Sequence, residues 1–168
     1  MGKISAENRQ LFNARIEPHT AKVKEAIDKE KNMLALIMKD TSGVGYKKIL
    51  LCENQIFIAT EWITVNNLSV ELLETKNNDS LNDARKSLYK AVIYLEDVVS
   101  SHIDCPYSDL DGYLAEISNI PLEKRFFLIK KLGLAITLLI DAFGENTKWK
   151  WSFVELQGRF VTVAKNIL

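Results

Sequence analysis

The sequence of 168 residues has few of the residues that mark unusual protein classes. Two cysteines are too few for a disulfide scaffold. Three prolines and seven glycines exclude a collagen-like, linker-rich or disordered chain. The longest apolar run, Leu132 to Ile140, falls short of the ~20 residues that a membrane-spanning helix needs. We therefore expect a single globular domain over residues 1–168, without a membrane span, whose core is large enough to be stable without disulfides.

The N-terminus also lacks the features of a secretory signal. Its first ten residues, MGKISAENRQ, are mostly polar and contain no apolar segment of the kind that a signal peptide carries. We expect a cytoplasmic protein in which the thiols of Cys52 and Cys105 are both free, because that compartment is reducing.

The chain has no net charge, because 22 basic residues balance 22 acidic ones. We therefore expect no nucleic acid as a partner and no attraction to an anionic membrane. The charge is nevertheless uneven, since residues 76–120 hold four basic and eight acidic side chains, and residues 121–168 hold eight basic and four acidic. Either these regions neutralise each other within the fold, or they orient a partner or a second subunit.

Helical spacing of apolar residues dominates the N-terminal half. A helix is predicted from Ser5 to about Glu17, and Pro18 predicts a break or kink before the same apolar face continues to Lys39. One kinked helix and two separate helices both fit this pattern. After a loop at 40–45, helical spacing resumes at Tyr46. The segment 56–65 is rich in β-branched and aromatic residues, but we favour a helix because no second strand exists to pair with it.

The remaining sequence predicts three longer helices and two short ones, each short helix lying just before a longer one. Ser69 to Leu73 and Ser108 to Ser118 are predicted as short helices. Apolar residues three and four apart predict a helix from Leu81 to Ile103, with Ser80 and Asp83 as a capping box. A largely apolar helix at about 122–143 is predicted to be central, and a last helix spans about 148–168. The fold class is therefore an all-α bundle of six to eight helices.

Metal-ligating patterns are incomplete. His102 and Cys105 are three residues apart but have no nearby third ligand, and a zinc site needs at least three protein ligands. Residues 109–114 resemble the middle of an EF-hand loop, but Tyr107 and Ser118 occupy the positions of its first and last carboxylates. The sequence contains no Glu-x-x-His pair, the signature of di-iron bundles. We expect no metal and no cofactor.

Catalytic motifs are also missing. There is no nucleophile elbow, no phosphate-binding glycine loop and no dinucleotide fingerprint. Cys52 lies in an apolar run and is predicted to be an inert core thiol. Arg15 and His19 resemble the Arg-and-His pair of HEPN nucleases, but only three residues separate them and Pro18 lies between. We assign no catalytic residue and favour a protein that is not an enzyme. An enzyme whose catalytic groups come together only in the folded protein remains an alternative.

The last helix carries apolar residues on two sides. Its main stripe includes Phe153 and Phe160 and is predicted to face the core. Trp151 lies about 200° from Trp149 around the helix, and on its side fall Val154, Gly158 and Val161. Either the helix is enclosed within its own bundle, or this second face is a contact surface for a partner protein or for a second copy of the chain.

Three functions from different classes therefore remain. The first is a protein that acts through protein–protein contacts or self-association of its C-terminal helix, with Trp151, Val154, Gly158 and Val161 as interface candidates. The second is a binder or sensor of a small apolar ligand, held between helices near four phenylalanines. These ligand-cavity candidates are Phe126, Phe127, Phe153 and Phe160. The third is an enzyme with a site that the sequence does not reveal.

Overall fold

The computed structural model describes residues 5–41, 44–103, 122–143 and 147–167. These residues form five α-helices and no strand, so the all-α class is confirmed. The helices are α1 (Ala6–Lys39), α2 (Val44–Leu73), α3 (Asn78–Ile103), α5 (Leu122–Phe143) and α6 (Thr147–Ile167).

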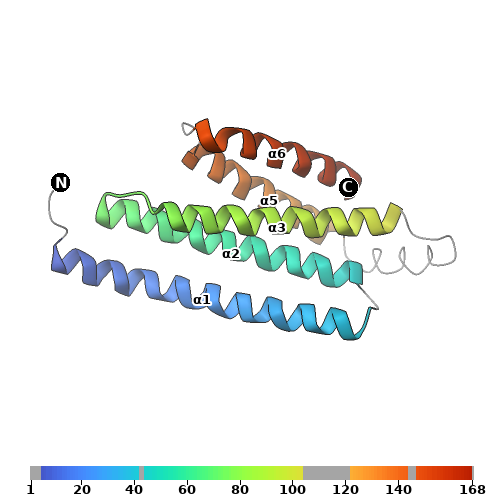
Figure 1. Ribbon diagram of the computed structural model, residues 1–168, viewed down its shortest axis with the longest axis horizontal. Coiled ribbons are helices and arrows are strands. Elements are labelled where there is room, and N and C mark those ends of the chain that lie inside the picture. The colour runs from blue at the N-terminus through green and yellow to red at the C-terminus, as the bar shows by residue number, and fades with distance from the viewer. Residues whose placement is uncertain (1–4, 42–43, 104–121, 144–146, 168) are drawn as a thin grey trace.

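Helices α1, α2 and α3 run side by side in alternating directions, and α5 and α6 form a second layer (Figure 1). The α2–α3 and α1–α2 interfaces are the most extensive, while α6 packs on α5 and α3. Among the described helices, α1 packs closely against α2, so it lies at one edge of the bundle. The α5–α6 pair forms the opposite side.

The prediction of six to eight helices is wrong for the described residues, which form five. Of the two alternatives at Pro18, one continuous helix is the one that the structure shows. Helix α1 continues through Pro18 for 34 residues, starting at Ser5, whose Oγ accepts a hydrogen bond from Asn8 N at 3.1 Å. A proline interrupts one backbone hydrogen bond of a helix, and here contacts with α2 on either side hold the helix together. The segment 69–73 is likewise the last turn of α2 and not a separate helix. The predicted helix at 108–118 lies outside the described residues.

The start of α3 differs slightly from its prediction. Ser80 N donates to Asn77 Oδ1 at 3.1 Å, so Asn77 is the cap, whereas Ser80 is buried inside the helix. Asn66 Oδ1 in turn accepts from Asn77 N at 2.9 Å, which ties this turn to α2. The apolar stripe itself is confirmed, and its described members are fully or almost fully buried: Leu81, Ala84, Leu88, Val92 and Leu95.

One large apolar cluster joins α2, α3, α5 and α6. It includes Cys52, Leu88, Leu132 and Leu156, and Trp62 lies between it and a smaller cluster under α1. Helix α5 contacts three other helices, but it is not enclosed: Leu134 and Leu138 on its outer face are exposed. The centre of the bundle is instead α2, which packs against α1, α3 and α5. Within the described ranges, no helix combines the length and apolar character needed to cross a membrane.

Candidate interaction surface

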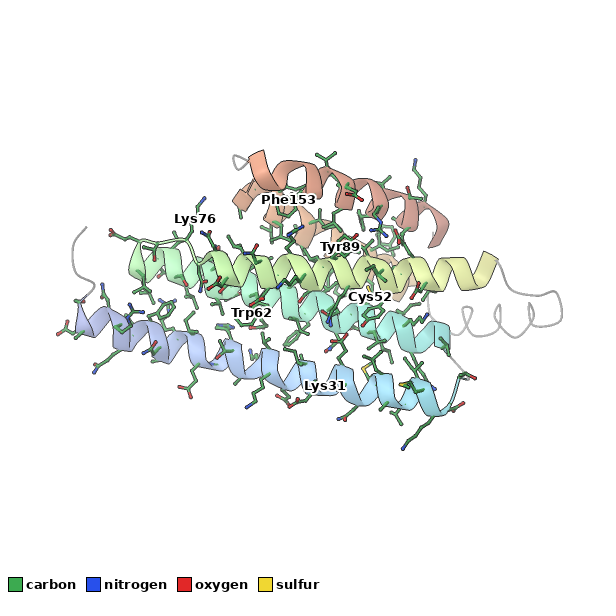
Figure 2. All side chains as sticks on the ribbon, viewed as in Figure 1. Lys31, Cys52, Trp62, Lys76, Tyr89 and Phe153 are labelled. Carbon is green, nitrogen blue, oxygen red and sulfur yellow. The ribbon has the colours of Figure 1, made fainter. Side chains whose placement is uncertain are left out.

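The inner face of α6 packs as its main stripe predicts. Phe153, Leu156 and Val163 are buried, and Phe160 is partly buried against the same cluster (Figure 2). Helix α5 approaches closely at Gly133, where an added Cβ atom would lie 3.2 Å from Phe160 Cζ. The missing side chain at Gly133 therefore leaves room for the Phe160 ring between the two helices.

The second face of α6 is open where the structure describes its side chains. Val154 and Val161 are exposed, and a Cβ atom built at Gly158 would meet nothing within 4 Å. Trp151 belongs to the same helix, but its side chain lies outside the described part. Val154 and Val161 are therefore about half exposed and lie outside the core clusters of the described residues.

Helix α5, which packs against α6, carries further exposed apolar side chains. Lys131 Nζ lies 4.7 Å from the centre of the Phe127 ring, a cation–π contact that leaves the ring at the surface. Six apolar side chains on α5 and α6 have exposed fractions between 43% and 62%: Phe126, Phe127, Leu134, Leu138, Val154 and Val161. We call these six residues the outer surface of the α5–α6 pair.

Sequence spacing identified only part of this surface. Of the predicted second face of α6, Val154 and Val161 are exposed, whereas Leu134 and Leu138 of α5 were not predicted as surface residues. A helix that is apolar around most of its circumference gives no indication of which apolar side faces water.

The four phenylalanines of the ligand hypothesis do not surround one cavity. Phe126 and Phe127 are at the surface, where they line a shallow depression on α5 with Glu123 and Lys130. Phe153 lies inside the core, and Phe160 fills the space beside Gly133. The structure therefore separates these residues into a surface pair and a packing pair.

A buried polar network crosses the first three helices, and sequence analysis missed it. The Glu30 carboxylate of α1 is only 6% exposed and accepts from Gln55 Nε2 at 2.5 Å and from Tyr94 Oη at 2.6 Å. Burial and then the hydrogen bond to Glu30 raise the pKa of Tyr94, so its phenol stays protonated and donates. Lys90 Nζ lies 4.0 Å from the same carboxylate. The network fastens the middle of α1 to α2 and α3.

The other candidate groups have structural partners. His19 Nδ1 lies 2.5 Å from Glu61 Oε2, and Arg15 pairs with Glu71 at 3.2 Å, so these two side chains link α1 to α2 separately. Burial raises the pKa of the Cys52 thiol, which keeps it protonated and unreactive. In the part of the chain that the structure describes, no three metal-ligating side chains gather. The side chain of His102, Cys105 and the loop 109–114 lie outside that part.

Fold and surface define an all-α bundle with an apolar outer surface on its C-terminal pair of helices. Residues 8–168 match the model of the TP0443 family, and the chain belongs to that family. Comparisons with curated proteins and with solved structures find no match.

Proposed function

We propose that the protein acts through protein–protein contacts, and that its principal contact is self-association through the outer surface of the α5–α6 pair. One observation carries the proposal: six apolar side chains on two neighbouring helices are each about half exposed. A group of exposed apolar residues is typical of interaction sites. Helix α1 carries another such group, and the α1 control below distinguishes the two: Leu11, Ile27, Leu34, Leu36 and Met38. Burying them in a second molecule recovers the hydrophobic free energy that they lack in the monomer.

The charge distribution supports a second copy as the partner. A chain without net charge does not repel its own copies. The basic region 121–168, which contains α5 and α6, would attract the acidic region 76–120 of another copy through the charges that remain after Arg159 pairs with Glu96 within the chain. Complementary charges of this kind set the orientation and rate of encounter, while the apolar residues supply the affinity.

The proposal includes a cytoplasmic location, with residues 1–168 acting as one helical domain. The free thiol of Cys52 is compatible with the reducing cytoplasm, and its burial also protects it from oxidation.

Charged substitutions on the outer surface test this function. We expect Leu134→Asp/Val161→Asp to weaken self-association at least ~10-fold, equivalent to about 1.4 kcal/mol, because each carboxylate would be buried in the contact. Sedimentation equilibrium over a range of protein concentrations measures this change. Both replaced residues are exposed in the monomer, so the helical circular dichroism spectrum should be unchanged.

A matched control comes from α1. Leu11 and Leu36 are 48% and 60% exposed, similar to the two residues above, but they lie on the opposite side of the bundle. Leu11→Asp/Leu36→Asp should associate as the unmodified protein does. A mass that stays monomeric at all concentrations, or equal weakening in both variants, would contradict the proposal.

A further inference from the structure

A groove with a volume of about 440 Å³ lies between α3 and α6, away from the outer surface described above. Helix α3 contributes Arg85, Lys86, Tyr89 and Lys90, and α6 contributes Ser152 and Glu155. Figure 2 labels Tyr89 on the part of α3 that lies next to α6. This volume is within the range of small-molecule sites, about 300–1,000 Å³.

The lining of the groove is basic, although most of its basic residues come from a region of the sequence with more acidic than basic residues. It contains three cationic side chains and one carboxylate, Glu155, which gives a formal charge of +2. Residues 76–120 hold only four basic residues in total, and three of them line this groove. The three lie within six consecutive residues of α3, so this short stretch concentrates positive charge in an otherwise acidic region, where it attracts an anion.

Part of the groove wall is held rigid by Arg159. Its guanidinium donates from Nε and Nη2 to the two carboxylate oxygens of Glu96, at 2.9 and 2.5 Å. The hydrogen bond to Glu96 raises the pKa of Arg159, so the group stays charged. Its Nη1 donates to Tyr89 Oη at 2.7 Å, and Arg159 Cζ lies 5.2 Å from the centre of that ring. The Tyr89 oxygen already accepts a hydrogen bond, so the phenol's own hydrogen is directed to another acceptor.

We propose that this groove binds the phosphate groups of a small polyphosphate ligand. A polyphosphate carries several negative charges and several acceptor oxygens, which match the excess positive charge and the varied donors. Lys86 and Lys90 offer mobile ammonium groups, the Tyr89 and Ser152 hydroxyls complete the set of donors, and Arg85 adds positive charge. Lys90 is 57% exposed and 4.0 Å from Glu30, close enough to the groove to turn toward a bound phosphate.

Binding of sodium pyrophosphate to the full chain, measured by isothermal titration calorimetry at low ionic strength, tests this proposal. We expect saturable binding by the unmodified protein and at least ~10-fold weaker binding by Lys86→Glu/Lys90→Glu. Tyr89→Phe keeps the ring and removes the hydroxyl, and should weaken binding several-fold. Circular dichroism verifies that each variant is folded.

The matched control reverses two lysines of another groove. Lys22 and Lys29 line a depression of about 520 Å³ between α1 and α2, where Glu25 and Glu53 balance their charge. Lys22→Glu/Lys29→Glu changes the net charge by the same amount and should bind pyrophosphate as the unmodified protein does.

Three results would overturn the proposal. They are the absence of saturable pyrophosphate binding, equal weakening by the two double substitutions, and binding of a single-stranded oligonucleotide without binding of pyrophosphate. Because this groove and the outer surface of the α5–α6 pair share no residue, the site stands or fails independently of self-association.

Discussion

Leu88→Ala is expected to lower the free energy of unfolding by about 2–5 kcal/mol. Leu88 is 0% exposed and belongs to the cluster that joins α2, α3, α5 and α6. The substitution removes buried apolar atoms and leaves a cavity that surrounding helices cannot fully close, and both effects destabilise the fold. The cluster contains residues of four helices, so we expect these helices of the Leu88→Ala variant to unfold together in a single transition. Urea denaturation followed by circular dichroism at 222 nm measures the loss.

The control for this prediction is Leu36→Ala on α1. Leu36 is mostly exposed, so its replacement should change the free energy of unfolding by less than about 0.5 kcal/mol. A similar loss for both substitutions would mean that the cluster around Leu88 is not the core of the protein.

Gln55→Leu is expected to cost about 1–3 kcal/mol, although leucine is the more hydrophobic side chain. The Glu30 carboxylate would remain buried after losing its hydrogen bond from Gln55 Nε2. Adding Tyr94→Phe removes the second donor and should increase the loss further. An uncompensated buried charge is among the most destabilising changes a core can suffer.

Replacing the acceptor as well should reverse most of this loss. In Glu30→Leu/Gln55→Leu/Tyr94→Phe no buried polar group of the network is left without a partner, and Lys90, which loses Glu30, is 57% exposed and stays hydrated. The free energy of unfolding should therefore return close to the original value. Denaturation of the single, double and triple variants forms a mutant cycle, with an expected coupling of about 0.5–3 kcal/mol. Strictly additive losses would show that these three side chains do not act as a unit.

Local periodicity explains what the sequence predicted correctly. The core stripes of α3 and α6 follow from residues three and four apart, because their spacing fixes one face of a helix. The same spacing separated Val154, Gly158 and Val161 from the core stripe of α6. These predictions needed no knowledge of the neighbouring helices.

Features that depend on distant residues could not be predicted in this way. Pro18 left one kinked helix and two separate helices as alternatives, and α1 is one helix packed along α2. Glu30 and Tyr94 are 64 positions apart, and Arg159 is 63 positions from Glu96, so neither pair has a local signature. The exposed side of α5 also depends on where α6 packs, at Gly133, and not on the apolar content of α5 itself.

Photo-crosslinking from the outer surface of the α5–α6 pair tests self-association most directly. With p-benzoyl-phenylalanine in place of Leu134, irradiation of the purified protein should yield a covalent dimer on a denaturing gel. The same photoreactive residue in place of Leu36 should yield monomer, because that side chain is equally exposed but lies on α1. Monomer alone from position 134, or equal dimer from both positions, would contradict the assignment of this surface.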